Sequence, residues 1–164
     1  MAIRASGPYP PVQVQGKNPV YAEMMLGNIG GSNSEMSAVA HYRYAHVVLE
    51  DEHLAELVHQ ISMVEMQHLD DFSHLAKLLG AEPRMWQSCG CKKVYWSPAY
   101  VDYEFCNKRE LLQKFIAEEK NAIRKYTAQI NCISDPDVAA VLQRIIEDEQ
   151  EHVKTWEEEL AKLG

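Results

Sequence analysis

Two Glu-x-x-His motifs lie at positions where a charged side chain is costly. Along one apolar helical seam, with positions spaced alternately by four and three residues, the only polar positions are Glu65 and His68. A second seam near the C-terminus is interrupted in the same way by Glu149 and His152. A buried glutamate destabilises a protein unless it is paired or bound to a cation. The two motifs therefore indicate a cation-binding site inside a helical core.

An internal repeat adds further candidates to these motifs. Glu35 and Tyr42 are seven residues apart, so they share one helix face. Glutamates of each half lie symmetrically about a predicted turn, near residues 50 and 134, so that folding brings them level. The halves read as copies of one unit. A shift of 84 residues places Glu35 on Glu119, Tyr42 on Tyr126, Glu65 on Glu149 and His68 on His152.

Four carboxylates and two imidazoles are a donor set for two divalent cations. Two such ions balance the four negative charges. Oxygen and imidazole ligands suit iron and manganese, and the lack of thiolates in the core argues against a zinc–cysteine site. Without metal, the crowded carboxyl groups should each have a raised pKa. A buried polar network or an exposed acidic face is the alternative, and Glu118 is the alternative to Glu119, although only Glu119 keeps the repeat. The predicted metal ligands are Glu35, Glu65, His68, Glu119, Glu149 and His152.

The elements that must position these residues are helices. A chain of 164 residues is the size of one domain. We expect residues 1–32 to form an irregular arm with a short helix, and residues 33–164 to form an all-α four-helix bundle of two hairpins. The long crossover between the hairpins, near residues 81–106, shows nothing typical of a strand. Helices are predicted over residues 19–29, 34–49, 54–79, 111–133 and 138–163.

The composition excludes several other classes of protein. Hydrophobic residues make up 46% and charged residues 24%, which is typical of a globular chain. A net charge of −8 disfavours nucleic-acid binding. No apolar run approaches the ~20 residues of a membrane span. The first twenty residues lack the apolar core of a secretory signal, so we expect a cytoplasmic protein that binds neither membrane nor nucleic acid.

The motifs also resemble a known family. EMSAVAHY with VEMQH, and EEKNAIRKY with EDEQEH, are similar to the ferritin-like superfamily, nearest to its rubrerythrin-type di-metal domains. The segment NPVYAEMMLGNIGGSNSEMSA is similar to manganese catalases. The resemblance implies a ferritin-like bundle with two metal ions per chain. It also implies that Glu35 and His68 bind one metal, that Glu119 and His152 bind the other, and that Glu65 and Glu149 bridge them.

The sequence departs from these families at several points. Ala122 stands where rubrerythrins carry a further carboxylate, and the two CxxC pairs of their rubredoxin module are absent from the sequence. Met66 resembles the haem-binding methionine of bacterioferritins, with a core methionine as the alternative. Only 12 residues follow His152, which is too few for the fifth helix of cage-forming ferritins.

Other polar residues have two interpretations each. Asp148 could hold a ligand histidine by its second nitrogen or be a surface acid. Tyr42 and Tyr126 could donate to ligand carboxylates, relay an electron, or be core tyrosines with satisfied hydroxyls. The cysteines form no disulfide framework, but Cys89, Cys91 and Cys106 could hold a metal or a redox pair. Solvated positions are expected for His41, His53, His59 and His74.

These residues favour a dinuclear iron or manganese oxidoreductase that acts on hydrogen peroxide or dioxygen. A peroxidase of this type needs an external electron-donor protein, whereas a catalase needs none. The alternatives are ferritin-like iron storage with a ferroxidase step, or a structural bundle that metal merely stabilises. We expect a homodimer or a higher homo-oligomer.

Overall fold

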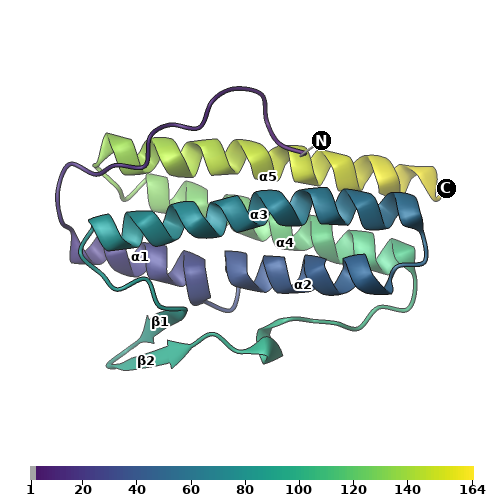
Figure 1. Cartoon of the computed structure of the whole chain (residues 1–164), viewed down its shortest axis with the longest axis horizontal. Helices are drawn as coiled ribbons and strands as arrows, with labels where there is room; N and C mark the ends of the chain where they lie inside the picture. Colours follow the sequence, from purple (N-terminus) through teal and green to yellow (C-terminus); the bar gives the residue numbers. More distant parts are fainter. Residues whose placement is uncertain (1–2) are drawn as a thin grey trace.

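Two helical hairpins pack side by side in the computed structural model, which describes residues 3–164 (Figure 1). α2 packs against α3, and α4 packs against α5. α1 lies end to end with α2 and also packs on α3 (Figure 1). The predicted all-α bundle of two hairpins with one long crossover is confirmed. Its helices are α1 (Pro19–Gly30), α2 (Glu35–Val48), α3 (Glu52–Leu78), α4 (Lys108–Ile130) and α5 (Pro136–Lys162).

Capping residues set where the helices begin and end. The side chains of Asn18 and Asp135 accept hydrogen bonds from the backbone N–H groups two and three residues later, and a proline follows each as the first helical residue. α3 ends just before Gly80, whose φ of +103° lies in the region that favours glycine. These caps set the lengths of the helices that carry the ligand motifs.

The crossover contains a short antiparallel hairpin of β1 (Trp86–Cys89) and β2 (Lys92–Tyr95). The prediction that nothing in this segment is a strand was therefore wrong. Gly90 has a φ of +59° and takes the first turn position, where two-residue hairpins favour glycine. The hairpin packs on α1 at Gly30, where a Cβ would lie 2.4 Å from the carbonyl carbon of Met85. A 3₁₀ turn, η1 (Pro98–Tyr100), follows.

Two apolar clusters fill the bundle on either side of its middle. One lies toward α1 and includes Phe72, Leu75, Leu142 and Ile145. The other lies toward the opposite end and includes Val58, Ile61, Phe115 and Trp156. The Glu-x-x-His motifs fall between these clusters along α3 and α5. Within residues 3–164, no helix has a stretch long and apolar enough to cross a membrane.

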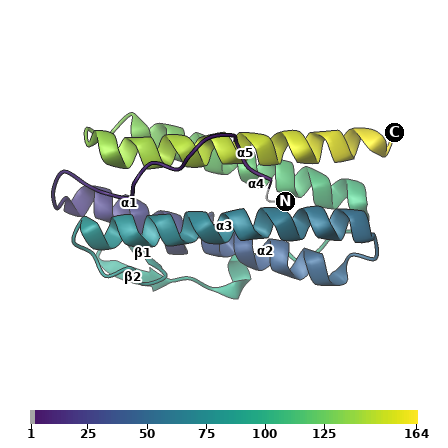
Figure 2. The ribbon, with the colours of Figure 1, turned by 45° about the horizontal axis from the view of Figure 1, so that its top comes forward.

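The N-terminal arm, residues 3–18, contains no helix and runs along α5 (Figure 2). Val12 and Val14 pack against the apolar cluster near α1. The backbone N–H of Gln15 donates to Asp135 at 2.8 Å, and Ile3 packs against the other cluster. The arm thus passes over the middle of the bundle on the α5 side.

Candidate metal centre

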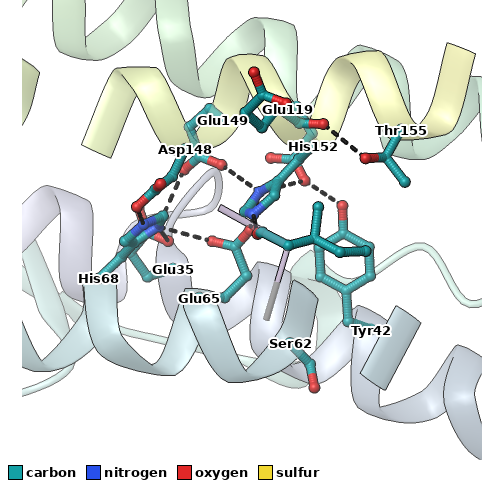
Figure 3. Close-up of polar contacts among 12 residues, drawn as sticks. Glu35, Tyr42, Ser62, Glu65, His68, Glu119, Asp148, Glu149, His152 and Thr155 are labelled. Carbon is teal, nitrogen blue, oxygen red and sulfur yellow. Dashed lines mark hydrogen bonds and ion pairs between the residues drawn. The ribbon is translucent and has the colours of Figure 1, made fainter. Parts of the chain in front are cut away.

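Six titratable side chains meet in the middle of the bundle, pointing toward one another from facing helices (Figure 3). α3 and α5 each supply a glutamate and a histidine, while α2 and α4 each supply a glutamate. None of the six is more than 3% exposed. The structure brings together every residue that the sequence predicted as a metal ligand: Glu35, Glu65, His68, Glu119, Glu149 and His152.

These residues form two overlapping groups of four. One group is Glu35, Glu65, His68 and Glu149, and the other is Glu65, Glu119, Glu149 and His152. In each group, one donor atom per residue lies within 4.8 Å of the others. Because Glu65 and Glu149 belong to both groups, they are the two that could bridge a pair of ions.

A break between α1 and α2 places Glu35 at the centre. The chain leaves α1 at Gly30, and Ser34 caps α2 by accepting from the backbone N–H of Ser37. Glu35 is therefore the first residue of α2, level with the middle of the longer helices. Its counterpart Glu119 needs no such break because it lies within α4.

Both histidines turn Nδ1 toward the shared glutamates. His68 Nδ1 lies 3.2 Å from Glu65 and 3.4 Å from Glu149. His152 Nδ1 lies 2.9 Å from Glu149 and 3.0 Å from Glu65. Oε1 of Glu65 is the atom that lies 3.0 Å from His152 Nδ1, and it is buried there without making a hydrogen bond. A buried carboxylate oxygen that faces an imidazole nitrogen without a hydrogen bond fits a cation ligand better than a closed polar network.

The carboxyl groups of the cluster differ in protonation. Burial, with repulsion from Glu65 and Glu149, raises the pKa of Glu35 to about 8. Burial also raises the pKa of Glu119 well above its usual range. Burial opposes ionisation of Glu65 too, but His152 and His68 outweigh it and hold the pKa of Glu65 low. The expectation that the pKa of every glutamate would rise was therefore wrong for Glu65, because two imidazoles face it.

The histidines take up protons in the same cluster. Burial lowers the pKa of each, but the surrounding carboxylates outweigh it, with Glu149 the strongest for His68 and Glu65 for His152. The pKa of both imidazoles is therefore raised well above its ordinary value. Protons thus supply the counter-charge that two divalent cations would otherwise bring. Four carboxylates and two imidazole Nδ1 atoms fit two such ions in charge and donor type.

Two tyrosines bond to the cluster across the repeat. The Tyr42 hydroxyl donates to Glu119, and the Tyr126 hydroxyl donates to Glu35. Tyr42 accepts in turn from Trp156 Nε1 at 3.0 Å. Each tyrosine thus holds the glutamate of the opposite half. Burial and the nearby carboxylates raise the pKa of both tyrosines, so they remain donors.

Asp148 is fully buried and is not a surface acid. Its Oδ2 lies 3.2 Å from Nε2 of His68, on the side of the ring away from the cluster. Burial opposes its ionisation, but His68, Arg144 and Tyr9 outweigh this and lower the pKa of Asp148 to about 2. The ionised carboxylate can therefore keep a proton on His68 Nε2.

His41 differs from its sequence prediction. Expected to be solvated, it is only 2% exposed, because it packs edge-on against Phe115 and pairs with Glu118 at 2.9 Å. Glu118 thus pairs with His41 and is absent from both donor groups. No simple spacing rule would have singled out this pair. A polar residue on the buried face of a helix was the only signal.

A cavity of about 220 Å³ reaches the cluster between α2 and α4. Four of the six cluster residues line its inner end, with Tyr42 and Tyr126. Exposed residues such as Ser32, Asn33 and Asn121 line its outer end. Its volume suits a molecule of a few heavy atoms.

The remaining candidates lie away from the cluster. All four cysteines are exposed and free, and within residues 3–164 the donor groups contain none of them. Met66 is 51% exposed, so the alternative that it is a core methionine was wrong. Its resemblance to a haem ligand stays a prediction.

Comparisons with known proteins agree with this architecture. The family model described as Ferritin-like domain matches residues 32–164. A Clostridium acetobutylicum protein named "Probable manganese catalase" is 24% identical over 170 residues, covering 93% of this chain and 75% of that protein. The fold is similar to a manganese catalase from Anabaena, with a TM-score of 0.87 at 21% identity over all of this chain and 81% of the other. A Mycobacterium tuberculosis bacterioferritin gives a TM-score of 0.70 at 20% identity, over 91% and 89% of the two chains.

Proposed function

This chain belongs to the ferritin-like family, and on that premise we propose that it is a dinuclear manganese or iron oxidoreductase of catalase type. The substrate is hydrogen peroxide, which the enzyme converts to water and dioxygen. A protein named as a manganese catalase is similar to this chain over 93% of its length, and this similarity favours catalase activity over the other activities of the fold.

The observation that carries the proposal is the pair of overlapping donor groups. Glu35 and His68 would hold one ion and Glu119 and His152 the other, with Glu65 and Glu149 shared by both. A structural bundle gains nothing from four buried glutamates, since apolar residues of similar volume would pack there without the cost of burying charge. The cluster is therefore better explained by a bound metal pair than by a role in folding.

When bound, a manganese or iron pair supplies the two electrons that pass between successive peroxide molecules. Two molecules of hydrogen peroxide give two of water and one of dioxygen, so the reaction balances without an outside donor. One peroxide gains two electrons and two protons, and the other loses the same number. A peroxidase would instead need an electron-donor protein.

The chain's own residues orient the site and limit what reaches it. Tyr42 donates to Glu119 and Tyr126 donates to Glu35, the two glutamates that would each hold a single ion. These hydrogen bonds fix which carboxylate oxygen faces the centre. Apolar clusters pack on both sides of the centre, and the cavity between α2 and α4 reaches its four glutamates. A cavity of about 220 Å³ is large enough for hydrogen peroxide.

Ferroxidase activity with iron storage is the second candidate, favoured by the fold similarity to a bacterioferritin. The two functions can be distinguished by the size of the assembly and by the number of iron atoms that each chain accumulates. A storage protein assembles into a cage, so it would elute as a very large particle and accumulate many iron atoms per chain.

The test is oxygen evolution from hydrogen peroxide by protein loaded with manganese or with iron, without a reductant. We expect about two metal ions per chain and sustained oxygen release. Glu65→Gln should weaken the binding of both ions and lower the oxygen release, whereas Glu158→Gln, an exposed change on α5, should leave both intact. Peroxide consumption only with a reductant would indicate a peroxidase, and metal binding that saturated well below one ion per chain would overturn the dinuclear site.

A further inference from the structure

The two ligand histidines are supported by different parts of the chain. His68 has a carboxylate on its outer nitrogen, because Asp148 lies 3.2 Å from Nε2. The repeat of 84 residues places Val64 where the second half has Asp148, and Val64 is buried and apolar. His152 therefore lacks the acceptor that the symmetry of the bundle would otherwise provide.

The N-terminal arm fills this gap. The backbone carbonyl of Ile3 lies 3.1 Å from Nε2 of His152. A carbonyl oxygen can only accept a hydrogen bond, so this contact keeps a proton on Nε2. The opposite nitrogen, Nδ1, is then the one whose lone pair a metal can take. A main-chain atom more than a hundred residues away thus does for His152 what Asp148 does for His68.

The arm is held in place by the same aspartate. The backbone N–H of Ala5 donates to Asp148 at 2.7 Å, and the Tyr9 hydroxyl donates to the other carboxylate oxygen. Arg144 donates both to Asp148 and to the carbonyl of Ala5, the latter at 3.0 Å. Its guanidinium also lies over the Tyr9 ring, 4.2 Å from the centroid.

We propose that residues 3–9 are a positioning strap for the metal centre, in which the Ile3 carbonyl orients His152 in place of the missing carboxylate. Ala5 fixes Ile3 because only one residue separates them, and Ala5 is itself fixed on Asp148. One carboxylate therefore supports His68 directly and His152 through the arm. This inference rests on the proposed metal centre for its purpose, but the contacts that define it belong to the metal-free chain.

The first test uses metal-free protein and is independent of any activity. In protein with ¹⁵N-labelled histidine, we expect the Nε2 protons of two imidazoles to resonate downfield and to exchange slowly with water. Removal of residues 2–6 should abolish the slow exchange for His152 alone, because Asp148 still accepts from His68. If both protons stayed protected without the arm, the strap would be disproved whatever reaction the centre performs.

The second test measures metal affinity. Loss of a hydrogen-bonded support behind a ligand typically weakens metal binding by about 10- to 100-fold. Protein lacking residues 2–6 should bind one of its two ions that much more weakly and keep the other. Ala5→Pro, which removes the N–H that donates to Asp148, should do the same to a smaller extent and serves if the shortened chain does not fold.

Gln13→Ala is the matched control. Gln13 also ties the arm to α5, through a 2.9 Å bond to Asp137, but it lies far along the arm from the histidines. We expect this variant to bind both ions as the parent does. Unchanged affinity for both ions in a folded Ala5→Pro protein, or an equal loss in Gln13→Ala, would show that the arm stabilises the fold without positioning His152.

Discussion

Glu65 contacts both ligand histidines at once, as Glu149 also does from the facing helix. A carboxylate has two oxygens and can bind two ions at once. An imidazole with one nitrogen facing the centre can bind only one. The glutamates and histidines of the two motifs should therefore differ in how many metal ions each one holds. This difference can be measured directly.

Replacing a shared glutamate should disturb both ions, and replacing a histidine mainly one. We expect Glu65→Ala and Glu149→Ala to weaken the binding of both ions by more than the about 10- to 100-fold typical of an outer support. His68→Ala and His152→Ala should leave one ion bound near its parent affinity. Titration of manganese into the four variants, followed by calorimetry, measures this. Loss of a single ion in all four would contradict the bridging role.

At the scale of helices and strands, the spacing of apolar residues predicted an element where one face is buried and the other is exposed. Glu65 and His68 could be predicted because they interrupt an apolar seam, and such an interruption needs no knowledge of the partner helix. The repeat then identified Glu35 and Glu119, which no local pattern marks. The nearest family suggested by the motifs, the rubrerythrins, stays a prediction, whereas the manganese catalase resemblance has support from the comparisons.

The hairpin, and the contact that the arm makes with His152, could not be predicted for a physical reason. Strands of four residues are too short to show alternation, and their packing on α1 depends on a glycine far away in sequence. The Ile3 contact uses a backbone carbonyl, which every residue has, so no residue type marks it. The only signal was negative. Val64 stands where the repeat would need an acid.

The packing of the hairpin on α1 depends on Gly30, and this contact can be tested by substitution. A Cβ at Gly30 would lie 2.4 Å from the Met85 carbonyl carbon and 2.5 Å from the Trp86 nitrogen, both of them backbone atoms that cannot rotate away. Gly30→Ala should therefore lower the free energy of unfolding by about 1–3 kcal/mol, as overpacking does. Denaturant unfolding measures it.

Gly27→Ala is the control on the same helix. A Cβ at Gly27 meets nothing within 4 Å, and alanine favours helix over glycine by up to about 1 kcal/mol. This variant should be as stable as the parent or slightly more so. Equal destabilisation by both changes would mean that helix α1, and not its contact with the hairpin, determines the result.

For the molecule as a whole, the cluster links metal, protons and stability. In metal-free protein the pKa of Glu35 is raised to about 8, that of Glu119 is raised, and both histidines have raised pKa values. The folded chain therefore binds more protons than the unfolded chain, whose Glu and His side chains have ordinary pKa values near ~4.3 and ~6.5. Each extra proton makes stability fall by about 1.4 kcal/mol per pH unit as pH rises.

We therefore expect the metal-free protein to lose stability as pH rises from 5 to 8. The lowered pKa values of Glu65 and Asp148 have the opposite sign, but they act near or below pH 4, where those groups titrate in the unfolded chain. Metal reverses the trend in the loaded protein, because ions displace the bound protons and bind more tightly as the ligands ionise. Thermal melts of both forms across this range test the linkage. Metal-free stability that rose with pH, or identical melts of the two forms, would mean that the four glutamates are not a proton-holding cluster that metal replaces.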